Sequence, residues 1–132
     1  AHDANCHYGL GGVAGHAGLF STVGDILRYA AFWAPDGPLP PELRAAALSR
    51  QTPHGATARG LGWALDGAGR AAHTGFTGTS LRYDPVSGQL LVALTNRVHP
   101  RVKDGIGAWR EALAARVDAP VGSQGRQGEG RR

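Results

Sequence analysis

Apolar residues recur with two different spacings along the chain, and the change of spacing separates helical from extended segments. From Thr22 to Trp33 they recur every three or four positions, which predicts an amphipathic helix capped by Thr22. Two prolines suit the first turn of a second short helix over 42–50. A last helix is predicted by apolar residues at spacings of 4, 3, 4 and 4, namely Val102, Ile106, Trp109, Leu113 and Val117.

Between these helices the spacing is typical of β-strands. Apolar and small residues alternate over 60–65, and two further short strands are expected at 71–75 and 79–83. Residues 90–94 are continuously apolar, as in a strand covered on both faces. Closely spaced strands without crossover helices predict an antiparallel sheet. With helices before and after that sheet, the predicted fold class is α+β.

The sheet is expected to lack packing partners. The predicted helices supply part of the cover that residues 90–94 need, but residues 1–20 are rich in Gly and His and are predicted to form loops. The predicted helices and strands lie within residues 1–118, which are expected to be the folded portion of the chain. Residues 119–132, which are rich in Gly, Gln and Arg, are predicted to be a disordered tail.

Composition excludes several classes of function. The 132 residues contain no methionine, so we expect Ala1 to have been exposed by processing or the chain to be the back part of a longer protein. No apolar run approaches the roughly 20 residues of a membrane span. The net charge is +4, of which residues 119–132 carry +2, so the body shows no basic stripe for nucleic acid. Cys6 has no second cysteine with which to form an internal disulfide.

Two ligand-binding patterns near the N-terminus are weak. Residues 9–14 fit G-x-G-x-x-G/A, but a dinucleotide fingerprint requires a preceding buried strand, which this segment lacks. His2, Asp3, His7 and His16 lie near Cys6, yet their spacing is not that of a zinc site. We therefore expect neither a cofactor nor a metal, and a His/Asp metal-binding protein is kept only as a rival hypothesis.

No serine in the chain stands in a recognisable nucleophile motif. None lies in G-x-S-x-G, and none is followed three residues later by a lysine, because Lys103 is the only one. Cys6 and His7 are adjacent, and neighbouring side chains of an extended segment point in opposite directions. The sequence thus provides no convincing nucleophile with its base.

The segment 72–80 carries the clearest chemical signal. His73 and Thr74 end a predicted strand, and Gly75 removes a side chain where a substrate must lie close to the backbone. The backbone N–H of Phe76 is then placed to donate to a developing oxyanion. The alternative interpretation is a glycine-rich bend between two strands with a solvated histidine.

This segment resembles the third motif, K-T-G or H-T-G, of the serine β-lactamase and penicillin-binding-protein superfamily. Residues 73–80 are similar to the H-T-G-F-T-G-T-S variant of its class C-like branch. Residues 60–63 resemble the G-L-G-W strand of that branch, and 90–96 resemble the strand that ends in L-T-N. The stretch A-G-L-F-S-T within 12–29 is similar to a further segment, so the likeness covers residues 1 to about 117 in the family's order.

The resemblance implies the C-terminal part of a serine hydrolase that acylates a serine with an ester, amide or lactam substrate. His73 and Thr74 would line the cleft, Gly75 would allow close approach, and Phe76 N–H would belong to the oxyanion hole. A small-molecule or peptide acyl substrate and a bacterial periplasmic or secreted location are then expected. His73 replaces the lysine of true β-lactamases, which is compatible with an esterase or a peptidase.

Two motifs of the family are absent from the chain. S-x-x-K, which supplies the nucleophile, does not occur, and no tyrosine is followed two residues later by asparagine. We therefore expect the chain to be inactive by itself. The rival within the same fold is a non-catalytic module that binds a peptide or glycan in the remaining cleft.

Overall fold

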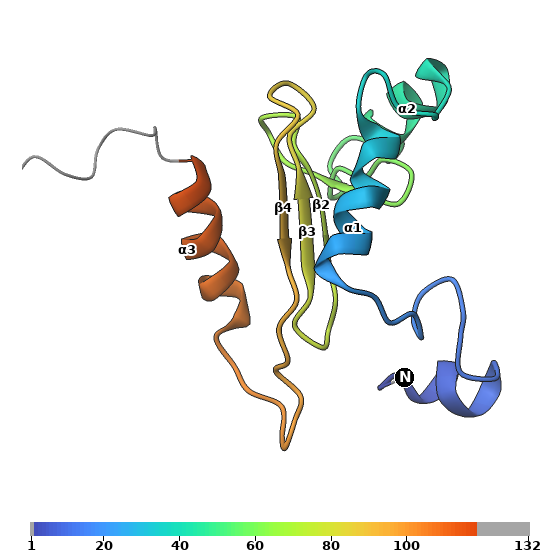
Figure 1. Ribbon diagram of the computed structural model, residues 1–132, viewed down its shortest axis with the longest axis vertical. Coiled ribbons are helices and arrows are strands. Elements are labelled where there is room, and N and C mark those ends of the chain that lie inside the picture. Colours follow the sequence, from blue (N-terminus) through green and yellow to red (C-terminus); the bar gives the residue numbers. More distant parts are fainter. Residues whose placement is uncertain (1, 119–132) are drawn as a thin grey trace, which may run out of the picture.

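The computed structural model of the protein describes residues 2–118, so the tail predicted over 119–132 lies outside the described residues. Its elements follow one another as three groups: short helices, four strands and a final helix (Figure 1). They are η1 (Asn5–Gly9), α1 (Val23–Ala30), η2 (Ala31–Trp33), α2 (Pro41–Leu48), β1 (Ala64–Leu65), β2 (Ala71–Thr74), β3 (Ser80–Tyr83), β4 (Leu90–Ala93) and α3 (Ile106–Asp118).

The four strands form one antiparallel sheet in the order β1-β2-β3-β4. Helix α3 covers one face of this sheet, and α1 and α2 lie on the other (Figure 1). The predicted α+β class and antiparallel sheet are confirmed. Within residues 2–118 no helix is long and apolar enough to cross a membrane.

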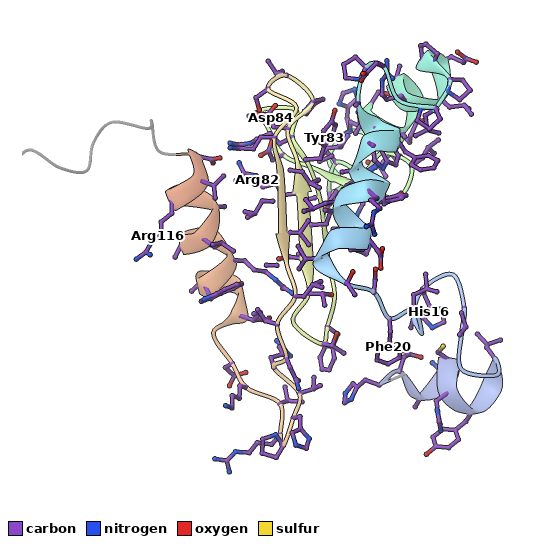
Figure 2. All side chains as sticks on the ribbon, viewed as in Figure 1. His16, Phe20, Arg82, Tyr83, Asp84 and Arg116 are labelled. Carbon is purple, nitrogen blue, oxygen red and sulfur yellow. The ribbon has the colours of Figure 1, made fainter. Side chains whose placement is uncertain are left out.

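Strand alternation sends neighbouring side chains of β3 to opposite faces of the sheet. Figure 2 shows Tyr83 directed toward α1 and Arg82 toward α3. The Tyr83 hydroxyl donates to the carbonyl of Trp33 over 2.9 Å, while an Arg82 Nη2–H donates to a carboxylate oxygen of Asp118 over 2.7 Å. One strand therefore connects the sheet to the helices of both outer layers.

The core lies between the sheet and the helices η2 and α2. Trp33 meets Trp63 edge to face, with ring centroids 5.2 Å apart, an arrangement that aromatic pairs prefer. Tyr83 is buried beside them, and burial raises the pKa of its hydroxyl. The other buried members of this cluster are small, namely Ala47 and Ala71.

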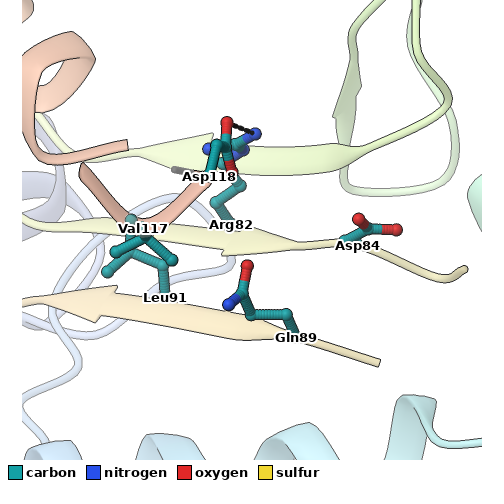
Figure 3. A pocket seen from close by; sticks show the side chains of 6 residues that line it. All are labelled: Arg82, Asp84, Gln89, Leu91, Val117 and Asp118. Carbon is teal, nitrogen blue, oxygen red and sulfur yellow. Dashed lines mark hydrogen bonds and ion pairs between the residues drawn. The ribbon is translucent and has the colours of Figure 1, made fainter. Parts of the chain in front are cut away.

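Helix α3 is held to the sheet at its C-terminal end by ion pairs. Asp118 accepts from Arg82 over 2.7 Å and from Arg70 over 3.1 Å, and Arg70 also pairs with Asp66. Arg82 and Asp118 line a small cavity of about 10 Å³ together with Leu91 and Val117 (Figure 3). That volume holds about one water molecule, so this cavity is a packing feature rather than a ligand site.

Three element predictions need correction. The strand predicted over 60–65 is reduced to Ala64–Leu65 because Gly62 has φ +80° and Leu61 N–H turns back to the carbonyl of Ala47, at the end of α2. The last helix begins at Ile106, after Gly105 with φ +85°, and leaves Val102 outside. Residues 5–9, predicted to be loop, form one π-helical turn.

The cover of the sheet is incomplete, as the sequence predicted. Leu90, Leu91 and Val92 are only half-buried, although the prediction for 90–94 was cover on both faces. The outer edge of β4 pairs with no other strand among residues 2–118. Leu19 and Phe20 are 84% and 88% exposed, so apolar surface remains open near the start of α1 as well.

Candidate functional site

The His-Thr-Gly segment occupies the end of β2 and the tight connection to β3. Strands β2 and β3 pair up to Thr74 and Ser80, and Gly75 N–H then donates to the carbonyl of Thr79 over 2.8 Å. Gly78 N–H donates back to the carbonyl of Gly75 over 3.1 Å, which closes a four-residue turn. Phe76 and Thr77 are the two central residues of that turn.

The backbone N–H of Phe76 donates to no acceptor within residues 2–118. The reason is geometric, because in a β-turn the hydrogen bond joins the outer residues and the first central N–H points away from the ring it closes. Strand β1 pairs only with Ala71 and Ala72, so the outer edge of β2 is also unpaired beyond them among the described strands. An open N–H therefore stands at an open strand edge.

Two glycines allow this turn to form. A Cβ on Gly75 would collide with the Thr79 hydroxyl. Gly78 has φ +117°, a conformation that L-residues rarely adopt, and a Cβ there would lie 2.7 Å from Thr95 Oγ1. Thr95 instead donates its hydroxyl to the Gly78 carbonyl over 2.7 Å. The G-x-x-G spacing thus has a steric explanation in the structure.

Arg110 reaches this turn from helix α3. Its Nη2 donates to the carbonyl of Gly75 over 2.8 Å and to the carbonyl of Thr79 over 2.7 Å. Burial, and secondarily the nearby charge of Arg97, lowers the pKa of the Arg110 guanidinium. A half-buried cation therefore clamps both ends of the turn that carries Phe76.

The predicted site residues lie together but face different ways. His73 and Thr74 are both exposed and are adjacent on β2, so their side chains stand on opposite faces of the sheet. His73 lies opposite Leu81 and Thr74 opposite Ser80 in the register of β2 and β3. Phe76 is 60% exposed beyond them.

Two further residues lie against the Phe76 ring, and the sequence predicted neither of them there. The Cζ of Arg97 lies over the ring, 4.6 Å from its centroid. The imidazole of His2 stacks on Phe76 with centroids 5.6 Å apart. Arg97 directly follows the L-T-N segment and belongs to no periodic pattern. Arg110, which contacts the same turn, is one of several polar residues on the last predicted helix, so no sequence pattern singles out either arginine.

The N-terminal histidines form no metal cluster in the structure. No group of three or more His, Cys, Asp or Glu side chains within residues 2–118 is arranged to hold a metal ion. Asp3 contacts His16 over 3.3 Å, and the backbone N–H of Cys6, followed by His16, lowers the pKa of the Asp3 carboxyl. The G-x-G-x-x-A stretch begins at the end of η1 instead of following a strand.

The beta-lactamase family profile matches residues 1–116. The chain belongs to the beta-lactamase family. The resemblance seen in the sequence is thereby confirmed, and so is membership of a serine hydrolase family.

Curated relatives of this beta-lactamase family chain come from Salmonella and carry the name "Putative D-alanyl-D-alanine carboxypeptidase". The protein of Salmonella agona strain SL483 is 35% identical over 119 residues, which cover 76% of this chain and 27% of the relative. That of Salmonella newport strain SL254 is 34% identical with the same coverage. The chain thus spans about a quarter of the length of these relatives. No solved structure matches it.

Proposed function

We propose that the chain forms the His-Thr-Gly edge of an acyl-serine hydrolase site, with Phe76 N–H as one donor of the oxyanion hole. The observation that supports this most strongly is the Phe76 N–H itself, which has no acceptor in the described chain although the carbonyls of Gly75, Thr77, Gly78 and Thr79 around it all accept hydrogen bonds. A preorganised donor requires no rearrangement when negative charge develops on the substrate oxygen.

The neighbouring residues take roles that follow from their positions. Gly75 follows directly on the unpaired end of β2, and in this proposal the substrate backbone passes close to it. Thr74 offers a hydroxyl and His73 an imidazole at the same strand end, both exposed to an incoming substrate. An extended peptide lying along the edge of β2 would bring its carbonyl oxygen toward Phe76 N–H.

The nucleophile in this proposal is a serine from outside the 132 residues. Its hydroxyl oxygen would attack the substrate carbonyl, a base would take the hydroxyl proton, and the alcohol or amine would leave. Water would then hydrolyse the acyl-serine ester and regenerate the hydroxyl. No serine of this chain has a lysine three residues on, so we propose that the chain by itself turns over no acyl substrate.

The printed name of the relatives supports a proposal for the substrate class. Their name refers to removal of a D-alanine from a D-alanyl-D-alanine terminus. We propose the same class for the site to which this chain contributes, namely peptides that end in D-alanyl-D-alanine. A histidine at position 73 is compatible with such a peptidase, as it is with an esterase.

A chimera tests the proposal. The stretch of the Salmonella agona relative that this chain matches is replaced by residues 1–118, and release of D-alanine, nitrocefin cleavage and p-nitrophenyl acetate hydrolysis are measured. We expect turnover by the chimera and none by the separate chain. Turnover by the separate chain with all its serines replaced would refute the assignment. A folded chimera that binds the peptide without turnover would instead favour the non-catalytic binding module.

A further inference from the structure

The Phe76 N–H shares one peptide unit with the Gly75 carbonyl. The peptide bond between the two residues is trans, so the N–H and the carbonyl point in opposite directions within one plane. The Gly75 oxygen accepts two hydrogen bonds, from Gly78 N–H over 3.1 Å and from Arg110 Nη2 over 2.8 Å. A carbonyl oxygen has two lone pairs, and these two bonds engage both of them. The direction of the Phe76 N–H is therefore determined by the groups that bind the Gly75 oxygen.

The other hydrogen bonds that reach this turn act on different peptide units. The Thr95 hydroxyl donates to the Gly78 carbonyl over 2.7 Å, and the Arg97 backbone N–H donates to the Thr77 carbonyl over 2.9 Å. Both carbonyls belong to later units of the turn, so neither bond acts on the unit that carries the proposed oxyanion donor. Among residues 2–118, Arg110 is the only residue outside the turn that binds this unit.

The Arg110 guanidinium also brings a positive charge to the turn. The side chain is half-buried on α3, and within residues 2–118 it forms no ion pair. One nitrogen, Nη2, makes both of its bonds to the turn, the second being to the Thr79 carbonyl over 2.7 Å. A cation at a carbonyl oxygen draws electron density through the conjugated peptide unit, which makes the N–H at the other end a stronger donor.

We propose that Arg110 is a positioning residue for the oxyanion donor, which acts through the Gly75 carbonyl to fix the direction of the Phe76 N–H and to strengthen it as a donor. The inference rests on the proposed function, since it takes the Phe76 N–H to face the substrate oxygen. Arg110 contacts no substrate in this proposal, because it binds the opposite end of the peptide unit. Negative charge develops on the substrate oxygen only on the way to the transition state, so Arg110 should affect kcat more than KM.

Kinetics of the chimera described above test this role, with p-nitrophenyl acetate and N-acetyl-D-alanyl-D-alanine as substrates. Arg110→Met should lower kcat roughly tenfold and leave KM within about twofold, because the donor is then misdirected and less polarised. Arg110→Lys should restore most of kcat. A single nitrogen of Arg110 makes both bonds, so an ammonium group can take its place and keep the charge.

Thr95→Val is the matched comparison, because it removes a hydrogen bond of similar length from the same turn, at the Gly78 carbonyl. It should lower kcat less than Arg110→Met does. In the complete chain labelled with ¹⁵N, Arg110→Met should shift the ¹⁵N signal of the Phe76 amide, whereas Thr95→Val should shift that of Thr79. The two signals differ in this way because each amide nitrogen is conjugated with the carbonyl before it.

Three results would each overturn the role of Arg110 and leave the proposed function standing. They are an unchanged kcat after Arg110→Met, an equal fall in kcat after Thr95→Val, and a Phe76 ¹⁵N signal that Arg110→Met moves no further than the exposed control Arg116→Met does. If the Arg110→Met chimera does not fold, Arg110→Gln takes its place, since it keeps a neutral donor, and it should also lower kcat with KM preserved. A chimera that turns over no substrate before any substitution would refute the proposed function and this role together.

Discussion

Replacing Arg110 by methionine should loosen the Phe76 turn while the rest of the sheet stays intact. Methionine keeps the length and helix propensity of the side chain but donates no hydrogen bond. The two bonds lost are those to the carbonyls of Gly75 and Thr79, of 2.8 and 2.7 Å. The change therefore removes the contact of α3 with the turn and little else.

The expected magnitude is modest. Hydrogen bonds from a charged group contribute about 1.5–3 kcal/mol each. Here one half-buried guanidinium makes both bonds, and burial together with the charge of Arg97 lowers its pKa, which offsets part of the gain. We take about 2 kcal/mol for the pair, which corresponds to about a thirtyfold change in the equilibrium for local opening.

Native-state hydrogen exchange measures this opening directly. The amides of Gly75 and Gly78 are protected by the hydrogen bonds of the turn, and both should exchange about thirtyfold faster in Arg110→Met. Arg116→Met is the control, because Arg116 is an exposed residue on the same helix (Figure 2) and should change neither amide. Unchanged exchange at Gly75 and Gly78, or equal acceleration at Ala71 and Tyr83 on the paired strands, would refute the clamp.

Three further changes probe the fold. Tyr83→Phe should lower the free energy of unfolding, measured by chemical denaturation, by about 1–2 kcal/mol, because it leaves the Trp33 carbonyl without its buried donor. Tyr29→Phe, at an exposed position, should lower it by almost nothing. Equal losses in the two variants would contradict this role of the Tyr83 hydroxyl. Gly78→Ala should lower the free energy of unfolding by about 2 kcal/mol or more, since φ is +117° and the new Cβ would press on Thr95, and an unchanged melting temperature would count against that strain. Burial raises the pKa of Asp66, but hydrogen bonds from Arg70 and then Ala68 outweigh it and the net pKa is lowered from 3.8. The stabilisation by Asp66 is thus present above the unfolded pKa and lost as the pH falls through the folded pKa. Asp66→Asn should therefore weaken the decrease in the free energy of unfolding with falling pH below about pH 5. An unaltered pH dependence of that free energy would show that the pairing contributes nothing.

Much of the fold could be predicted because its signals are local. The spacing of apolar residues located α1, α3 and the strands β2 to β4, since a helix or strand face is determined by neighbours within a few positions. The prediction of a strand over 60–65 was wrong for its first residues, because they bind the end of α2, a contact between distant parts of the chain. The length of that strand depended on Ala47, which no pattern around Leu61 could reveal.

In the candidate site, too, the local features could be predicted and the contacts between distant residues could not. The His-Thr-Gly stretch was visible because its residues are consecutive, and the glycine-rich bend that the sequence offered as the alternative interpretation is present in the structure. Arg110 meets Gly75 across 35 positions of sequence, and Arg97 joins the turn through the pairing of β3 with β4. Such contacts depend on register and helix placement, so the supporting arginines emerged only from the three-dimensional structure.

The oxyanion role of Phe76 N–H is tested most directly by a proline at that position in the active chimera. Proline removes the N–H and is favoured at the first central position of a turn, so Phe76→Pro should fold, and Phe76→Leu serves as the control that keeps the N–H. We predict that the turnover rate of Phe76→Pro falls roughly a hundredfold to a thousandfold below that of Phe76→Leu. Equal turnover by the two variants would contradict the account.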